Sequence, residues 1–328
     1  MPALAQVAIH PSQFPEKIRR DLLRCLRLRR IAPKFHYESY QQSQKWLALH
    51  EAYSPSRTEA DCAAVYDRAF RAAAKELGSR AATLVGLGCG GGQKDARLLL
   101  LLAKRGKAIS YVPCDVSVAL VLTASQAARS AVAGIACHPL VFNLDHAPKS
   151  PEIFATFGGA GKVRLFTFFG MIPNFEPATI LPKLAAFVRP SDFLLFSANL
   201  APGPDYAAGA RRVLPGYDNA LTRDWLLTFW HDLGVEEEDG RLRFSIEDSS
   251  LQVKRIAADF IFTRRRTLCV YGERFDFKKG AKVRLFFSYR YTPPLITSLL
   301  ARHRLNVIGQ WITASGEEGV FLCRKKRA

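Results

Sequence analysis

The residue types that most directly suggest a binding chemistry lie in a glycine-rich segment, "LVGLGCGGGQKD", at residues 84–95. Four glycines fall within residues 88–92, and Lys94 follows them. Glycine lets the backbone turn sharply and approach a ligand closely, and a helix that starts directly afterwards offers free backbone N–H groups. The Walker A pattern is not met, because Gln93 separates the last glycine from Lys94. The segment therefore predicts a loop that holds a nucleotide-like cofactor.

An acidic residue follows the next apolar segment, since "YVPCDVS" at residues 111–117 contains Asp115. An acid at the end of the second strand of a nucleotide-binding sheet is placed to accept hydrogen bonds from ribose hydroxyls. The glycines fit the G-x-G-x-x-G spacing of nicotinamide enzymes poorly, so a methyltransferase that uses S-adenosylmethionine (SAM) is the favoured interpretation. Glycines that merely form a turn are the alternative, which the position of Asp115 disfavours.

The elements that must position these residues alternate in type between Thr58 and Leu200. Short apolar runs predict strands, and segments with apolar residues at helical spacing predict helices, with Thr58 expected as the cap of the first helix. The predicted strands are 81–88, 108–117, 134–144, 162–170 and 191–200, and the predicted helices are 58–77, 93–106, 118–133 and 177–188. Such alternation predicts an α/β fold with a doubly wound, Rossmann-like sheet.

The remaining segments predict a second, smaller domain of α+β type. Residues 201–234 are expected to form a loop and then a helix, residues 240–292 are rich in strand patterns, and residues 306–326 suggest a closing hairpin. We expect residues 59–202 with 287–328 to form the cofactor-binding core, and residues 1–58 with 203–286 to form the domain that binds the substrate or covers it. Five aromatic residues within 35–53 suggest an aromatic lid, or a packing subdomain as the alternative.

The composition limits the choice of partners and compartment. The formal net charge is +18, which favours anionic partners, but the basic segments lack the interleaved aromatic residues of a nucleic-acid stacking surface. Solvated basic faces are therefore the favoured interpretation, and nucleic acid is the less favoured partner. The seven cysteines include no C-x-x-C pair, so we expect no metal site. We see no signal peptide and no apolar run of membrane-spanning length, and predict a cytoplasmic monomer or weak homodimer that does not bind membranes.

The order of the short motifs resembles the histidine-specific SAM-dependent methyltransferase family, from about Pro33 to Phe321. Residues 84–100 are similar to the family's E-L-G-S-G-T-S-E-K-T-R-x-L-L segment, with Lys94 on the family lysine, and "YVPCDVS" is similar to Y-x-P-x-D-V-S. The other similar segments are "APKFHYESYQQSQKW" to P-K-x-F-Y-D-x-x-G-S-x-L-F, "EAYSPSRTEA" to E-Y-Y-P-T-R-x-E, "FFGMIPNFEP" to L-G-S-T-I-G-N-x-x-P, "PGYDNALT" to A-Y-D-D-x-x-G-V-T, and "LFFSYRYT" to T-E-x-S-x-K-Y/F.

The resemblance implies a class I methyltransferase sheet and a set of site residues. It implies that Asn174, Tyr217 and Tyr53 hold the ammonium and carboxylate of an amino acid, and that Tyr37 and Ser288 line its side-chain pocket. The residues expected at the cofactor are Gly88, Cys89, Gly90, Lys94, Asp115, Val116, Phe142 and Asn143. The residues expected at the substrate are Tyr53, Trp46, Ala258, Phe286 and Ser288, with Asn174, Tyr217 and Tyr37 as the catalytic set.

The chain also departs from the family pattern. Gly86 stands where the family has an acid at the end of the first strand, and Val141 stands near the acid after the third strand, where Asn143 is a candidate substitute. Phe286 replaces the glutamate that binds imidazole, and Ala258 replaces a methionine. A phenyl ring cannot accept a hydrogen bond from the imidazole N–H, and a buried N–H without a partner costs about 1–3 kcal/mol.

These departures lead to a hypothesis about the reaction. We expect a SAM-dependent N-methyltransferase that acts on the amine of an amino acid or related small molecule, with a pocket altered towards an aromatic or modified substrate. No metal or covalent nucleophile is needed, because the methyl group of SAM is already activated and the enzyme must orient the amine and exclude water. The alternatives are an inactive binding protein, suggested by Gly86 and Val141, and a nucleic-acid methyltransferase, suggested by the net charge.

Overall fold

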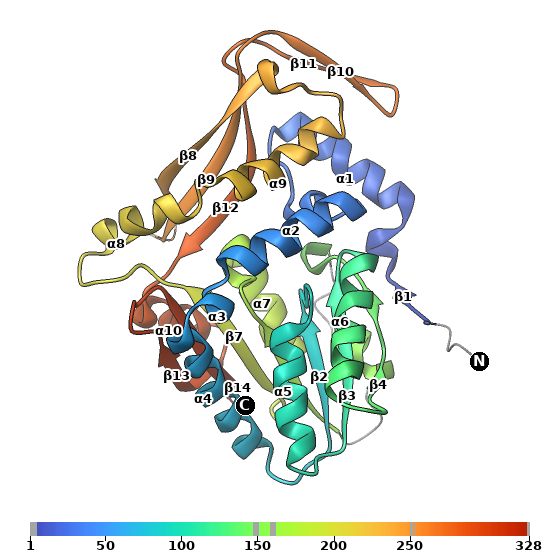
Figure 1. The fold of residues 1–328 in the computed structure, drawn as a ribbon, viewed down its shortest axis with the longest axis vertical. Coiled ribbons are helices and arrows are strands. Elements are labelled where there is room, and N and C mark those ends of the chain that lie inside the picture. The colour runs from blue at the N-terminus through green and yellow to red at the C-terminus, as the bar shows by residue number, and fades with distance from the viewer. Residues whose placement is uncertain (1–4, 147–150, 158–161, 250, 252, 327–328) are drawn as a thin grey trace.

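A mixed sheet forms the centre of the larger part of the molecule in the computed structural model, which describes residues 5–146, 151–157, 162–249, 251 and 253–326 (Figure 1). Within those ranges the strand order is β1-β5-β3-β2-β6-β7-β14-β13, and β4 also pairs with β3. The strands are β1 (Ala8–Ile9), β2 (Ala82–Leu87), β3 (Ile109–Asp115), β4 (Ala136–Cys137), β5 (Leu140–Val141), β6 (Val163–Phe168), β7 (Phe193–Asn199), β13 (Leu305–Ile312) and β14 (Glu318–Lys325). Strands β1 to β7 pair with one another in parallel, whereas β14 is antiparallel to both β7 and β13. This arrangement confirms the predicted α/β fold and its closing hairpin.

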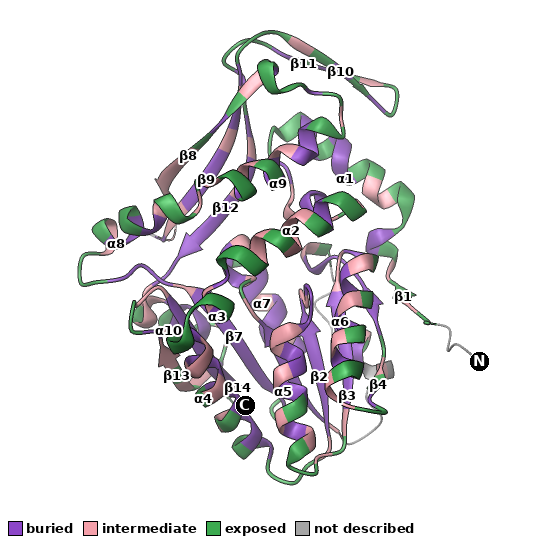
Figure 2. Ribbon diagram, in the orientation of Figure 1, coloured by how far each residue is buried: buried purple, intermediate pink, exposed green. Residues whose placement is uncertain are grey.

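Helices cover both faces of this sheet (Figure 1). They are α4 (Ala60–Leu77), α5 (Gln93–Lys104), α6 (Val118–Ala131), α7 (Pro177–Phe187) and α10 (Pro293–Ala301). Helices α4, α5 and α6 pack with Leu84 and Leu165 on one face, and α7 and α10 pack with Val85 and Phe166 on the other. Successive residues of a strand point to opposite faces, so β2 is buried at every position (Figure 2).

A second group of elements lies beyond the end of the large sheet (Figure 1). It consists of α1 (Pro15–Leu28), α2 (Tyr40–Tyr53), α3 (Pro55–Thr58), α8 (Tyr206–Val213), α9 (Ala220–His231), β8 (Gly240–Asp248), β9 (Lys254–Phe262), β10 (Arg266–Val270), β11 (Glu273–Phe277) and β12 (Lys282–Arg290). Strands β12, β9 and β8 form an antiparallel sheet, and β10 pairs with β11. Leu26 of α1, Trp230 of α9 and Phe260 of β9 share one apolar cluster, which holds these segments together. Within this group, helix α2 lies on the side that faces the large sheet.

Strand β12 contributes to both apolar regions. Val283 and Leu285 belong to the cluster of the smaller group, whereas Phe287 and Tyr289 belong to the core of the large sheet. The expected boundary between residues 286 and 287 therefore falls inside one continuous strand. The division of the chain into two domains stays a prediction, and the structure shows that β12 physically links the two parts.

Four local details differ from the expectations. Thr58 ends α3, and Glu59 is the N-cap residue of α4. The segment 201–234 contains α8 as well as α9, because Asp205 caps a first helix with its side chain. The predicted strand 134–144 consists of only β4 and β5, interrupted near Pro139, which has no backbone N–H for a strand ladder. Strand β1 was not expected.

Three further observations concern the cysteines, metal ions and membranes. The seven cysteines form no disulfide. Among the described residues, no three histidine, cysteine or acidic side chains are grouped so that they would hold a metal ion. No helix in the described ranges has both the length and the apolar character needed to cross a membrane.

Candidate cofactor and substrate site

The glycine loop between β2 and α5 adopts backbone conformations that favour glycine. Gly88, Gly90 and Gly92 have φ angles of 64°, 52° and 75°. A Cβ atom added to Gly90 would lie 2.5 Å from the indole of Trp46, and one added to Gly88 would lie 2.7 Å from the side chain of Met171. Both distances are far below van der Waals contact. Glycine at positions 88 and 90 therefore lets the loop pack directly against these two side chains.

Asp115, at the end of β3, is oriented by the same loop. Its Oδ2 accepts a hydrogen bond from the backbone N–H of Gly90 at 3.1 Å, and its Oδ1 accepts one from the backbone N–H of Ser117 at 3.2 Å. Burial raises the pKa of the Asp115 carboxyl to about 6. A carboxylate can accept about four hydrogen bonds, so each oxygen keeps capacity for a ligand hydroxyl.

A small cavity of about 60 Å³ lies beside Asp115. Its walls include Val116, Phe142 and Asn143, which follow β3 and β5, so an apolar slot adjoins a carboxylate. Asn143 is buried, and its Oδ1 accepts a hydrogen bond from the backbone N–H of Asp145, which leaves the amide nitrogen as the donor of this side chain. These groups fit an adenosine: the carboxylate suits ribose hydroxyls, and the apolar slot suits a planar base.

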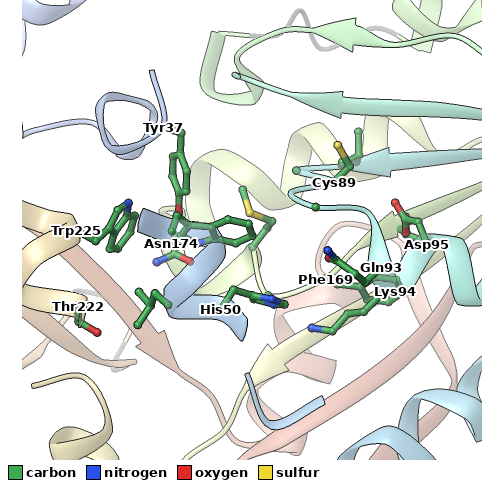
Figure 3. A pocket seen from close by; sticks show the side chains of 18 of the residues that line it. Tyr37, His50, Cys89, Gln93, Lys94, Asp95, Phe169, Asn174, Thr222 and Trp225 are labelled. Carbon is green, nitrogen blue, oxygen red and sulfur yellow. The ribbon is translucent and has the colours of Figure 1, made fainter. Parts of the chain in front are cut away.

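A larger cavity of about 270 Å³ adjoins the small one, because Tyr37, Trp46, Gly88 and Met171 line both. Figure 3 shows its two sides. Tyr37, Asn174 and Trp225 lie on one side, and Cys89, Gln93, Lys94 and Asp95 lie on the other, with His50 between them. The second side carries the start of α5 and the glycine loop, so this cavity joins the expected cofactor side to the expected substrate side.

Aromatic rings form the wall of the larger cavity on its substrate side. Phe286 of β12 lies between Tyr217 and Trp225, with ring centroids 6.0 and 6.1 Å away. The ring centroid of Tyr37 lies 5.5 Å from that of Trp225 and 5.7 Å from that of Trp46. The rings come from β12, α9, α2 and the segments before the two helices, so only the packing of α2 and α9 against the β12 sheet brings them together.

Two polar side chains face the same cavity from fixed positions. Asn174 follows β6, and its Nδ2 donates a hydrogen bond to the carbonyl oxygen of Phe287 at 2.9 Å. The hydroxyl oxygen of Tyr217 accepts hydrogen bonds from Asn199 Nδ2 at 2.9 Å and from the guanidinium of Arg290 at 2.8 Å. A hydroxyl has two acceptor sites and one proton, so Tyr217 is left to donate, either to Ser288, 2.9 Å away, or to a ligand.

The structure brings most of the sequence-predicted site residues to the two cavities. The larger cavity is lined by Tyr37, Trp46, Gly88, Cys89, Lys94, Asn174, Tyr217 and Phe286, and the smaller one by Gly88, Gly90, Asp115, Val116, Phe142 and Asn143. Ser288 is buried and reaches the larger cavity only through Tyr217.

Two expected substrate residues lie elsewhere. Tyr53 is 52% exposed and lines a neighbouring cavity beside Arg290 and Glu318, because it stands at the very end of α2. Ala258 is fully buried on β9, paired with Phe286 across the sheet, and borders neither cavity. The structure therefore does not support contact of either residue with a ligand in the larger cavity.

Other cavity residues were missed by the sequence interpretation. Asp95, Thr167, Thr222 and Trp225 all line the larger cavity. Asp95 directly follows Lys94 in the sequence, so its position next to the glycine loop could have indicated that it lies at the site. Thr222 and Trp225 carried no such signal, because they lie on an amphipathic helix whose contact with the cavity depends on how α9 packs.

The chain is similar to known proteins in sequence and in fold. The family model described as "Histidine-specific methyltransferase, SAM-dependent" matches residues 18–325. The chain is 26% identical to the histidine N-alpha-methyltransferase of Mycobacterium tuberculosis (strain CDC 1551 / Oshkosh) over 316 residues, 90% of each chain. It is 26% identical to the protein of the same name from Mycolicibacterium smegmatis (strain ATCC 700084 / mc(2)155) over 329 residues, 94% of each chain. Among solved structures, the CcbJ methyltransferase from Streptomyces caelestis matches with a TM-score of 0.40 and 12% identity, over 80% of this chain and 95% of that chain.

The family match spans nearly all of the chain, and it includes the glycine loop, Asp115 and the residues of both cavities. The cofactor expected from the sequence is thus the cofactor of the matched family. The chain belongs to the histidine-specific, SAM-dependent methyltransferase family.

Proposed function

We propose that the protein transfers a methyl group from SAM to the α-amine of an amino acid whose side chain is aromatic or a modified, largely apolar group. The observation that carries the proposal is the position of Phe286. It lies in the cavity wall opposite the glycine loop, within an aromatic surface that also contains Tyr217 and Trp225. The two relatives named above are methyltransferases of histidine, and Phe286 is where the family pattern has a carboxylate that binds imidazole.

The cofactor side of the site has groups that suit each part of SAM, which supplies an electrophilic methyl group on a sulfonium when it is bound. Asp115 would accept hydrogen bonds from the ribose hydroxyls, and Val116 and Phe142 would contact the base. The glycine loop and the start of α5 would hold the methionine portion in the larger cavity. Trp46 and Met171 line both cavities and would exclude water from the region between them.

Asn174 and Tyr217 supply opposite hydrogen-bonding groups for the backbone of an amino acid. Since Nδ2 of Asn174 already donates to Phe287, its Oδ1 is the group that can accept a hydrogen bond from the substrate amine. Tyr217 accepts two hydrogen bonds already, so it donates, and a carboxylate is a fitting acceptor. The buried guanidinium of Arg290 behind Tyr217 adds positive charge on that side. Together these contacts would fix the orientation of the amine lone pair.

The amine must be neutral to react, and none of the described residues that line the larger cavity is a strong base for its proton. Burial, together with Lys94 and Arg57, lowers the pKa of His50 to about 3, so His50 stays neutral and is a weak base. Burial raises the pKa of Tyr37, which keeps its hydroxyl protonated. We infer that water takes the proton before the amine binds, so the rate should rise with pH through the pKa of the substrate amine.

Among the described residues, the side-chain end of the cavity has no carboxylate that could accept a hydrogen bond from an imidazole or imidazolium N–H. Of the described residues that line the larger cavity, Asp95 alone carries a carboxylate, and it lies on the cofactor side. Thr222 offers one hydroxyl beside the aromatic wall. An indole or phenol ring would bury apolar area against Phe286 and Trp225, with edge-to-face contacts worth about 0.5–1.5 kcal/mol beyond that area.

The experiment that tests the proposal is a mass-spectrometric screen of the purified protein with SAM and the twenty amino acids, together with N-methyl and prenylated aromatic amino acids. We expect methylation of tryptophan, tyrosine or a modified aromatic amino acid with a kcat/KM at least about tenfold above that for histidine. The matched amide and the N-acetyl form of the best substrate should react poorly, because they lack the carboxylate and the free amine. Methylation of histidine well above the aromatic amino acids would contradict the proposal.

A further inference from the structure

Asp95 is a buried carboxylate that faces the larger cavity without an ion pair among the described residues. It is 3% exposed and is the third residue of α5. Its Oδ2 accepts a hydrogen bond from the Tyr111 hydroxyl at 2.7 Å, and its Oδ1 accepts one from the Thr167 hydroxyl at 2.7 Å. The Lys94 ammonium lies over the Tyr66 ring instead, 4.7 Å from its centroid. A buried carboxylate is costly unless a cation compensates it, so this arrangement calls for a positively charged ligand group.

The carboxylate occupies the space above Gly86. A Cβ atom on Gly86 would lie 2.2 Å from Oδ2 of Asp95, so the side chain of Asp95 fits only because residue 86 has none. Gly86 of β2 pairs with Thr167 of β6, and this is where the two strands carry the glycine loop and the Asn174 segment. The hydroxyl of Thr167 thus holds Asp95 at the carboxyl end of the central strands, where ligands bind in sheets of this kind.

The family pattern has the opposite arrangement at these two positions. In the E-L-G-S-G-T-S-E-K-T-R-x-L-L segment, the acid corresponds to Gly86 and a threonine corresponds to Asp95. Side chains at positions 86 and 95 would occupy the same space. The two differences from the family pattern are therefore equivalent to moving one carboxylate from the end of β2 to the start of α5. The loss of the strand acid at Gly86 is then not a loss of the negative charge at the site.

We propose that Asp95 binds the α-ammonium group of the methionine portion of SAM, in place of an acid at position 86. The ammonium would complete the set of hydrogen bonds on the carboxylate, which Tyr111 and Thr167 orient from the two neighbouring strands. The inference rests on SAM as the cofactor and not on the proposed methyl acceptor. A negative result in the acceptor screen would therefore not contradict the role of Asp95. A negative result for Asp95 would likewise not contradict the proposed methyl acceptor.

Calorimetric binding of two ligands tests the proposal without any turnover. S-adenosylhomocysteine carries the α-ammonium, and 5′-methylthioadenosine has the same nucleoside without the amino-acid portion. For Asp95→Asn we expect affinity for S-adenosylhomocysteine to fall at least about tenfold, the range of a lost charge-assisted hydrogen bond, with the affinity for 5′-methylthioadenosine changed less than about twofold. Asp115→Asn should weaken both ligands. Asp67→Asn, in an ion pair with Arg97 on the neighbouring helix surface, is the control and should change neither.

A double-mutant cycle tests whether a carboxylate at position 86 can replace the one at position 95. Asp95→Thr should lower the affinity for S-adenosylhomocysteine as much as Asp95→Asn does. The Gly86→Glu/Asp95→Thr protein should recover most of that affinity, because it again has a carboxylate at the end of β2. Unchanged affinity in Asp95→Asn, or an equal loss for both ligands, would overturn the proposal.

The wild-type protein provides a measurement that needs no variant. Burial raises the pKa of Asp95 to about 6, so its protonation between pH 7.5 and pH 5 should weaken S-adenosylhomocysteine about tenfold. In the part of the chain that the structure describes, the other charged or titratable groups that face Asp95 are Lys94, Tyr111, Cys89 and Cys114. The pKa values of Cys89, Cys114 and Tyr111 are raised by burial and lie outside this range.

Asp115 also titrates near pH 6, but both ligands contain the ribose that it would bind, so the ratio of the two affinities isolates Asp95. A ratio that stays constant with pH would count against the proposal.

Discussion

The ring of Phe286 lies 6.0 Å from the ring of Tyr217, which brings the residue that departs from the family pattern next to a residue that retains it. Phe286 comes from β12, and Tyr217 lies just before α9. One residue thus shapes the apolar wall while its neighbour presents a hydroxyl. Under the proposed function, Phe286 would contact the substrate side chain and Tyr217 its carboxylate, so each proposed role is tested by its own variant.

Phe286→Glu should raise turnover of histidine. The carboxylate would give the imidazole N–H an acceptor worth about 1.5–3 kcal/mol, so kcat/KM for histidine should rise about tenfold or more, as measured by mass spectrometry of the methylated product. Phe286→Gln is the matched control, since it has the same length without the charge and should give a smaller rise. A fall in histidine turnover with Glu, with the protein still folded, would show that Phe286 does not contact the substrate side chain.

Tyr217→Phe should impair amino acids but not the corresponding decarboxylated amines. Loss of the donated hydrogen bond to a carboxylate should reduce kcat/KM for the best amino acid about 10–100-fold. The same variant should treat the decarboxylated amine as the wild type does. Tyr271→Phe, on an exposed turn, serves as the control. Equal losses for both substrates would instead indicate that Tyr217 acts on the amine or on the fold.

Gly90→Ala should weaken S-adenosylhomocysteine binding about tenfold or more, measured by calorimetry. The added Cβ would lie 2.5 Å from Trp46, and the φ of 52° is strained for alanine by about 1–2 kcal/mol. The backbone N–H that orients Asp115 would shift with it. Gly106→Ala has a similar φ of 69° with open space around it, so it isolates the effect of strain and should leave affinity unchanged. Affinity equal to wild type in Gly90→Ala would contradict the assigned loop.

Asp192→Ala should destabilise the protein by about 3–5 kcal/mol, since it leaves the buried Arg164 guanidinium without its carboxylate. Asp192 is fully buried and accepts hydrogen bonds from Arg164 at 2.8 Å and from Arg189 at 2.9 Å. Urea denaturation at pH 7 measures this loss. Asp276→Ala, at an exposed position of β11, should change the free energy of unfolding little.

The stabilisation by Asp192 should depend on pH in one direction. Its arginine partners lower its pKa below the ordinary value, so its contribution is present above the pKa of the unfolded chain, near pH 4, and disappears as pH falls through the folded-state value. The difference in unfolding free energy between wild type and Asp192→Ala should therefore shrink between pH 5 and pH 3. A constant difference over that range would contradict the assignment.

The sequence by itself determined the order of strands and helices in the cofactor-binding core. The α/β class, the glycine loop and Asp115 were predictable because they depend on local rules: apolar runs of strand length, glycine where φ is positive, and an acid directly after a strand. Family membership was also readable, because the motifs keep their order along the chain. The short strands β4 and β5 and helix α8 were not predicted correctly, since their lengths depend on turns and pairing partners that a local pattern does not contain.

Only the tertiary structure decided which of the candidate residues share a cavity. Tyr37 precedes α2 and Tyr53 is its last residue, yet Tyr37 lines the larger cavity and Tyr53 lines another, because the two ends of the helix lie in different places. Trp225 joins the site through the packing of α9. The same holds for Gly86 and Asp95, which are nine positions apart and compete for one space only because α5 folds back over β2. Side-chain proximity between elements arises from packing, and packing is not encoded in any one segment.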